Sequence, residues 1–236
     1  MTTDANIVHR SPNDTLRTWN RIAGFSGIAY VVLFVAMGAS IAASAPVFSD
    51  GADELREWFA DNQGPIAFFT WFAPMVFGVL GLTFAVGLLR RLTAGDTSGG
   101  ILPRLTFAGI VAGTAAGLVG MSLWAVMSLD PILDGASDGL LLTLSALDSV
   151  IFFALMPWAN AIFIISASAL MVQTRVMPTW LAGLGAVAGV LPVVGGTWLF
   201  SGDPDSAVRA VGFIGELGGM LWTLIASVFL IRSAAD

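Results

Sequence analysis

Residues 66–89 have the sequence IAFFTWFAPMVFGVLGLTFAVGLL, which contains no charged side chain and is followed directly by Arg90 and Arg91. A helix needs about 20 predominantly apolar residues to cross the hydrocarbon core of a bilayer. Backbone polar groups in hydrocarbon must be hydrogen-bonded within the segment, and this run is too long and too uniform for a barrel strand. The stretch therefore predicts a transmembrane helix.

The rest of the chain has the same character. Of its 236 residues, 56% are hydrophobic and only 11% are charged, whereas about 25% are charged in a typical soluble domain. Six runs are long enough to cross a bilayer, at 22–45, 66–89, 105–129, 147–172, 180–200 and 210–231. We therefore predict an all-α fold, a polytopic membrane protein built as a six-transmembrane-helix bundle, with no room for a second globular domain.

The arginines divide unevenly between alternate loops. One set of loops and tails holds Arg10, Arg17, Arg21, Arg90, Arg91, Arg104, Arg175 and Arg232, and the other set holds only Arg56 and Arg209. Arginine favours the cytoplasmic side of a membrane. We therefore expect a protein of a prokaryotic plasma membrane whose tails, 1–21 and 232–236, are both cytoplasmic.

The segment Ala43-Ser44-Ala45 resembles a signal-peptidase site. The apolar core of a signal peptide is 7–15 residues long, and the run before this segment is longer. We expect the first span to be retained as an anchor.

Several chemistries are excluded or disfavoured by composition. The chain has no cysteine and one histidine, His9, which we expect to be solvated in the tail. Thiolate metal sites and multi-histidine sites are therefore excluded within one chain. No basic stripe suggests nucleic-acid binding, and no nucleophile elbow, HExxH or P-loop motif is present. We predict a protein that is not an enzyme and that carries no cofactor and no metal.

Acidic residues crowd the loop after the first span. Within 49–64, Leu55, Trp58 and Phe59 recur at helical spacing, with acids on the opposite side. This pattern predicts a short extracytoplasmic amphipathic helix at the outer interface. It is either a connector whose acids face water or a lid or cation-binding rim over the bundle.

Four stretches carry a resemblance: WNRIAG at 19–24, WFADN at 58–62, MP at 156–157 and MPTWLAGLG at 177–185. With them, the chain resembles a large group of uncharacterised, mostly actinobacterial, multi-span membrane proteins. The resemblance covers most of the length. It implies the six-helix layout and no particular activity.

Three polar residues within the predicted spans form a candidate intramembrane polar site. Asp148 lies near the outer end of the fourth span and Glu216 about two turns inside the outer end of the sixth, while Asn160 lies near the midplane. An ionisable residue inside a membrane is a functional hypothesis by default, and desolvation of Glu216 would favour proton binding. Glu216 could pair with Arg209 or share a proton with Asp148. The alternatives are a neutral Glu216 that fastens two helices, an Asn160 that does the same, and an Asp148 placed at a helix N-terminus.

Glycine and proline give the packing pattern. Glycines spaced by four predict close helix contacts; they are Gly109, Gly113, Gly117, Gly185, Gly189, Gly215 and Gly219. The spacing does not separate contacts within the bundle from contacts in an oligomer. Pro74, Pro157 and Pro192 lie near mid-span, where they either only kink the helix or mark a transporter site.

Two functions remain from these observations. The first is a non-enzymatic bundle that acts by packing with itself as a homo-oligomer, with the lipid bilayer or with a membrane-protein partner. The second is a small proton- or cation-coupled transporter that uses Glu216 and Asp148. A water-accessible cavity that touches Glu216 and Asn160 would favour transport.

Overall fold

The computed structural model describes residues 12–233, and it is almost entirely helical, with no strand in that range. Six helical stretches are long and apolar enough to cross a membrane; they are Thr15–Ser44, Gln63–Gly95, Ile101–Met127, Asp138–Thr174, Thr179–Phe200 and Ala207–Arg232. The predicted all-α bundle of six spans is thus confirmed. His9, Arg10 and most of the predicted N-terminal tail lie outside the described residues.

Four of the spans are built on single long helices. These are α1 (Pro12–Ser40), α5 (Ile101–Met127), α9 (Thr179–Gly195) and α10 (Ala207–Arg232). Short 3-10 segments extend two of them: η1 (Ala42–Ser44) follows α1, and η5 (Gly196–Phe200) follows α9. Another, η3 (Thr93–Gly95), ends the second span.

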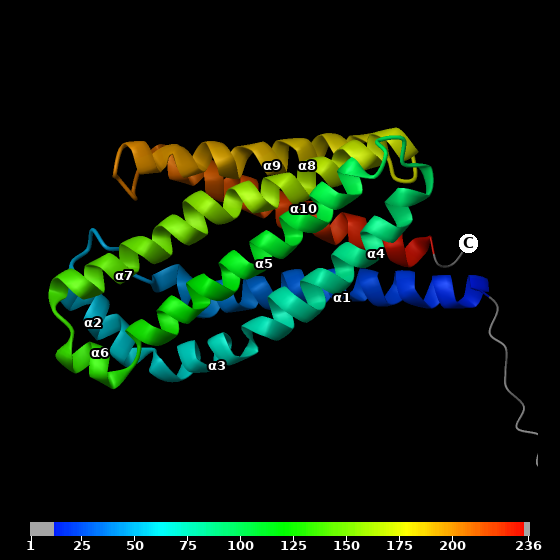
Figure 1. The fold of residues 1–236 in the computed structure, drawn as a ribbon. Helices are drawn as coiled ribbons and strands as arrows, with labels where there is room; N and C mark the ends of the chain where they lie inside the picture. The colour runs from blue at the N-terminus through cyan, green and yellow to red at the C-terminus, as the bar shows by residue number, and fades with distance from the viewer. Residues whose placement is uncertain (1–11, 234–236) are drawn as a thin grey trace, which may run out of the picture.

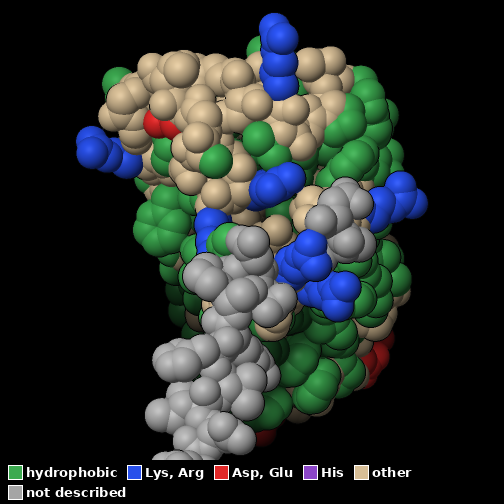
Figure 2. All heavy atoms as spheres, turned by 90° about the vertical axis from the view of Figure 1, so that its right-hand side faces the viewer, with side chains coloured by type: hydrophobic (Ala, Val, Ile, Leu, Met, Phe, Trp, Pro, Cys, Tyr) green, Lys and Arg blue, Asp and Glu red, His purple; other side chains and the backbone are tan. Residues whose placement is uncertain are grey.

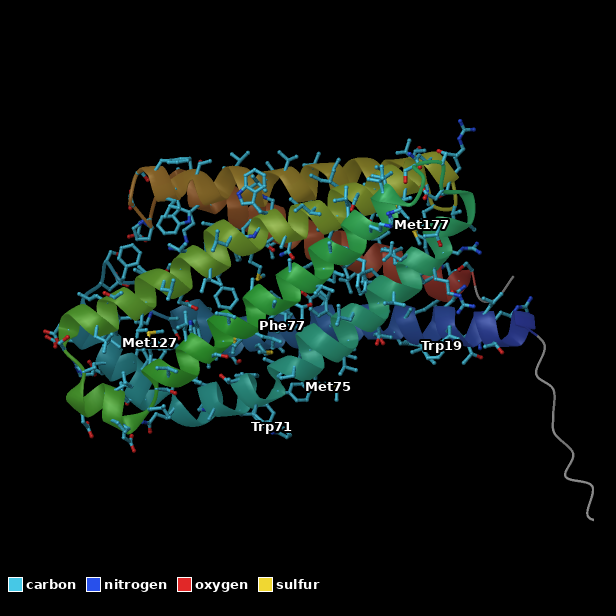
Figure 3. The ribbon with its side chains drawn as sticks, viewed as in Figure 1. Trp19, Trp71, Met75, Phe77, Met127 and Met177 are labelled. Carbon is cyan, nitrogen blue, oxygen red and sulfur yellow. The ribbon has the colours of Figure 1, made fainter. Side chains whose placement is uncertain are left out.

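The second span is composite. It consists of α3 (Gln63–Ala73), the π-helical segment η2 (Pro74–Gly81) and α4 (Leu82–Leu92). Proline lacks an N–H and disrupts the regular i→i−4 ladder, and the wider π turn begins at Pro74. Figure 3 shows Phe77 of η2 among the helices while Trp71 and Met75 point away; Phe77 is 4% exposed and Trp71 is 76% exposed.

The fourth span is composite in the same way. It consists of α7 (Asp138–Val150), the π-helical segment η4 (Ile151–Leu155) and α8 (Met156–Thr174). The helix begins at Asp138, where the Ser137 hydroxyl accepts a hydrogen bond from the Leu140 N–H. Its start lies well before the predicted start at 147, and the apolar helical stretch runs from Asp138 to Thr174.

The contacts between neighbouring spans close into a ring. Around it, α1 contacts α10, α10 contacts α9, α9 contacts α8, α8 contacts α5, α5 contacts α3 and η2, and α1 closes the ring against η2 and α4. Consecutive spans run in opposite directions because their connections are short. Inside this ring α4 also contacts α8 and α10, so side chains of these three helices share one core.

The two ends of the bundle differ in charge. The first turns of α1, the last turns of α4 and α10, and the start of α5 meet at one end (Figure 1), where arginine side chains gather (Figure 2). We call this the arginine-rich end; its described arginines are Arg17, Arg21, Arg90, Arg91, Arg104, Arg175 and Arg232. The opposite, acid-rich end carries α2 (Ala52–Asp61), α6 (Asp130–Gly135) and the start of α7.

Candidate functional site

A cavity of about 50 Å³ lies inside the ring. Its walls come from α1, η2, α4, α5, α8 and α10, so five of the six spans contribute to it. The lining residues are Tyr30, Phe34, Gly81, Phe84, Ile110, Met156, Asn160, Phe163, Ile164, Glu216, Gly219, Met220 and Thr223. Two of the three predicted polar residues, Glu216 and Asn160, therefore share one cavity.

Glu216 reaches the cavity from α10. It follows the first residue of that helix, Ala207, by nine positions, which is about 14 Å along the axis at 1.5 Å per residue. Its Oε1 atom is fully buried and has no hydrogen-bond partner. A buried polar atom without a partner costs free energy, so this carboxyl group is open to a proton or a ligand.

The orientation of Glu216 follows from the pattern of α10. Phe213, Ile214 and Leu217 are exposed and form the outward face, whereas Gly212 and Gly215 on either side of the inward face are buried. The exposed apolar residues face away from the bundle and the buried glycines face into it. Glu216 lies between these two faces, and its carboxyl group reaches the cavity inside the ring.

Asn160 reaches the cavity from α8, where it faces Gly113 of α5. A Cβ atom added at Gly113 would lie 2.7 Å from Asn160 Oδ1, which is too close for any real side chain. Gly113 therefore makes room for the amide group of Asn160 between α5 and α8. The expectation that Asn160 fastens two helices and the expectation that it contacts a ligand are both compatible with this position.

Tyr30 of α1 is the lining residue that the sequence analysis missed. It is the only tyrosine of the chain, and its ring contacts Phe34 at 6.0 Å and Phe77 at 6.4 Å between centroids. A single aromatic side chain with a polar tip in an otherwise apolar span was the available signal. It gives the cavity a hydroxyl group from α1, the helix next to α10.

The two π-helical segments flank the cavity. Gly81, the last residue of η2, and Met156, the first residue after η4, both line it. π-Helical turns inside α-helices are rare and occur frequently at functional sites. The prolines Pro74 and Pro157 thus accompany a change of helical pitch beside the cavity.

The expected pairing of Arg209 with Glu216 is not found. Its guanidinium group lies 4.2 Å from the centroid of the Phe153 ring and donates a hydrogen bond to the Pro204 carbonyl oxygen at 2.7 Å. These contacts hold the side chain at the acid-rich end of α10. No basic side chain is among the residues that line the cavity.

Asp148 does not line the cavity either. Its Oδ2 atom accepts a hydrogen bond from Trp124 Nε1 at 2.8 Å, and its buried Oδ1 atom has no partner. Because the helix begins ten positions earlier at Asp138, the interpretation of Asp148 as a residue at a helix N-terminus is wrong. Asp148 and Glu216 belong to separate environments.

The predicted amphipathic helix is α2, and it packs on protein. Leu55 and Phe59 are 0% and 3% exposed and belong to a cluster with Met127, Leu133 and Leu141. Because α6 and α7 fold over the apolar face of α2, protein covers this face, and the prediction that it lies at the membrane interface is wrong. This burial is a tertiary effect that periodicity alone does not reveal.

Polar contacts also join α2 to the rest of the acid-rich end. Arg56 forms an ion pair with Asp138 at 2.9 Å and donates to the carbonyl oxygens of Leu133 and Ala136. The Trp58 ring meets the Trp124 ring edge to face at 5.4 Å. Because Trp124 also bonds Asp148, α2 is connected to Asp148 and not to Glu216.

The predicted packing glycines lie at contacts between helices of the same chain. The backbone of α8 meets Gly109, the Phe77 ring meets Gly117, Trp222 meets Gly185, Ile165 meets Gly189, Pro192 meets Gly215 and Ile164 meets Gly219. Small residues let helix backbones approach closely in membranes. These faces are therefore occupied inside the bundle.

No model of a known protein family, no curated protein and no solved structure matches this chain. Function is therefore inferred from the residues of this chain alone, and the cavity around Glu216 is the feature with the clearest chemistry.

Proposed function

We propose that this protein is a proton-coupled carrier in which Glu216 binds the coupling proton. The observation that supports the proposal is a buried, unpartnered carboxyl oxygen in a cavity inside a closed ring of six spans. Asp148 is not part of this proposal, because it lies outside the residues that line the cavity.

The physical reason lies in the cost of a buried charge. An ionised carboxylate in an apolar interior is far less stable than in water unless it is paired. Glu216 has no basic side chain in its cavity, so either a proton or a bound cation must neutralise it. Binding and release of that positive charge then change the free energy of the site. This change can couple movement of the proton to movement of a solute.

Apolar clusters adjoin the cavity on both sides. Toward the arginine-rich end, Phe84, Phe163 and Ile164 belong both to the lining and to the largest core cluster, which also contains Leu88 and Trp222. In a carrier cycle this cluster would separate the site from the arginine-rich end.

Toward the acid-rich end, Tyr30 and Phe34 pack against a second cluster around Phe77 and Met121. We propose that a carrier cycle opens one of these two clusters at a time. The π-helical segments η2 and η4 lie beside the cavity and are the natural places for such a change.

The distribution of charge supports an orientation. Seven described arginines lie at one end, and the ends of α2, α6 and α7 bring acids to the other. By the preference of arginine for the cytoplasm, we propose that both termini are cytoplasmic and that the protein resides in the plasma membrane of a prokaryote. The acid-rich end then faces outward.

The alternative function, a bundle that acts by packing with copies of itself or with a membrane partner, was motivated by the glycine faces. Those glycines contact other helices of the same chain, so they supply no free surface for a partner. We therefore favour the carrier over the packing bundle, and a carrier over an enzyme.

Transport into vesicles tests the proposal. Purified protein in lipid vesicles is given an inward or outward pH gradient and a panel of labelled small solutes. We expect at least one solute to accumulate with the wild-type chain only while the gradient lasts. Accumulation should be lost with Glu216→Gln and retained with Glu57→Gln, a matched change at an exposed acid of α2.

The proposal is overturned if no solute of the panel accumulates with the wild type. It is equally overturned if Glu216→Gln vesicles accumulate the solute as well as wild-type vesicles do. Glu216→Asp, which keeps the acid and shortens its reach, serves as a second variant if the glutamine variant does not fold.

A further inference from the structure

We propose that the cavity around Glu216 binds a small organic ammonium ion, which takes the place of the proton on the carboxyl group. This inference rests on the proposed function, because it names the solute that a proton-coupled carrier with this cavity would exchange. It is carried by three features of the lining: its charge, its aromatic rings and its size.

The charge of the lining selects a cation. Tyr30 of α1 is the only other titratable side chain in the cavity. The helices α8 and α9 contain no acidic or basic residue, and the arginine nearest to the cavity on α10, Arg209, contacts Phe153 and Pro204 instead. When Glu216 loses its proton, the negative charge has no partner in the protein.

Near the cavity, the remaining elements add no charge either. On α1, Arg17 and Arg21 lie at the arginine-rich end, more than two turns before Tyr30. The segment η2 and the part of α4 that reaches the cavity have no acid or base, and the acid of α7, Asp148, bonds Trp124 away from the lining. On α5, the only charged residue is Arg104 in the first turn, at the arginine-rich end. A ligand must therefore bring the compensating positive charge.

Aromatic side chains favour an organic cation over a metal ion. Tyr30, Phe34, Phe84 and Phe163 line the same cavity as Glu216. Aromatic rings attract ammonium groups through their quadrupole, and alkylated ammonium ions lose less hydration energy than small metal ions do. This lining suits a cation that carries apolar carbon.

Polar groups of the lining are few. Besides Glu216, only Tyr30, Asn160 and Thr223 carry side-chain oxygens there. Calcium and magnesium ions need six or more oxygen ligands, so the cavity is poor in ligands for them. An ammonium N–H needs only one carboxylate and one or two neutral acceptors, which these residues provide.

The size of the cavity limits the ligand. A volume of about 50 Å³ holds on the order of three water molecules, at roughly 15 Å³ of probe volume for each. Methylammonium and dimethylammonium, with two and three heavy atoms, fall in this range. Tetraethylammonium is too large without a rearrangement of the walls.

The exchange step balances in atoms and charge. A protonated Glu216 carboxyl group and a methylammonium ion give a carboxylate–methylammonium pair and one proton, which leaves to water. No bond to carbon forms or breaks and no oxidant or reductant takes part. One proton is therefore released for each cation bound.

Proton release is the direct test. Purified full-length protein in weakly buffered detergent solution with a pH indicator is titrated with methylammonium chloride. We expect saturable release of one proton per bound cation from the wild type and from Glu57→Gln, and no release from Glu216→Gln. Phe34→Leu, which removes one ring and keeps an apolar side chain, should bind about 3–30-fold more weakly, as expected for one lost cation–π contact.

The outcomes separate this inference from the proposed function. If the wild type releases no proton with methylammonium but acid titration still shows a proton bound at Glu216, the ammonium site is overturned and the proton site stands. If acid titration shows no proton at Glu216, the proposed function itself fails. Equal proton release with sodium chloride would overturn the inference that the aromatic lining selects an organic cation. Equal proton release with tetraethylammonium chloride would overturn the inference that the cavity size limits the ligand.

Discussion

The substitution Gly109→Ala should separate α5 from α8. A Cβ atom at this position would lie 2.8 Å from the Ala159 carbonyl oxygen and 2.9 Å from Phe163 Cα, and it would also meet the Phe163 nitrogen. The three atoms that the added Cβ would meet all belong to the backbone of α8, so the clash cannot be relieved by rotation of a side chain. Because ordinary contact begins at 3.4 Å, the two helices must part by roughly 0.5–1 Å, which forfeits a quarter to a half of each contact energy along the interface.

The magnitude follows from two opposing effects. Overpacking of this kind costs about 1–3 kcal/mol, and the better helix propensity of alanine returns about 1 kcal/mol at most. We therefore expect Gly109→Ala to destabilise the protein by about 1–2 kcal/mol. At about 2–4 °C per kcal/mol for a chain near this length, the thermal midpoint in detergent should fall by roughly 2–8 °C.

The matched control is Gly183→Ala on α9. This glycine is exposed and has no atom within 4 Å of an added Cβ, so its substitution should leave the midpoint unchanged or raise it slightly. Thermal unfolding of both variants and the wild type in the same detergent measures the effect. A Gly109→Ala variant as stable as Gly183→Ala would refute the close contact between α5 and α8.

Three further predictions concern the loops and the acid-rich end. Arg56→Gln loses the ion pair and the carbonyl contacts of α2, so hydrogen exchange should quicken in α2 and α6 while the spans keep their protection. Trp124→Phe leaves the buried Asp148 carboxyl group without its one hydrogen bond, which should cost about 1–3 kcal/mol in detergent unfolding and less in a background that also carries Asp148→Asn. Hydrogen bonds from the Ser98 side chain and backbone hold the pKa of Asp96 below its ordinary value. Loop 96–100 should therefore be fully ordered above about pH 4 and should lose this order as the pH falls through the lowered pKa. The rate of amide exchange at Ser98, measured against pH in the wild type and in Asp96→Asn, tests this.

The sequence predicts the spans well because membrane insertion depends on local composition. A run such as 66–89 has no soluble alternative, and the neighbouring arginines add an independent pattern. Glu216 and Asn160 are equally visible, since a polar residue inside an apolar run is conspicuous. Their meeting in one cavity is a property of the ring and depends on which helices are neighbours.

Features that depend on tertiary contacts were harder to predict. The start of the fourth helical span at Asp138 depends on the Ser137 cap, and this placement changed the interpretation of Asp148. The docking of α2 depends on α6 folding over Leu55 and Phe59. Periodicity shows that a face is apolar but not whether lipid or protein covers it.

The sequence pattern also does not predict the change from α-helix to π-helix in the second and fourth spans. Pro74 indicated a kink, while the structure has a π-helical segment of 8 residues that ends at the cavity. Tyr30 was overlooked because one hydroxyl group barely changes the hydropathy of a span. Both features matter only once neighbouring helices bring them beside Glu216.

Infrared spectroscopy of the protein in lipid, recorded as a difference between acidic and basic pH, tests the central claim most directly. The account predicts a reversible carbonyl band from a buried carboxyl group in the wild type and in Asp148→Asn. That band should be absent from Glu216→Gln. A band of unchanged intensity in Glu216→Gln, or a wild type with no pH-dependent carboxyl band, would contradict the assignment of Glu216 as the proton site.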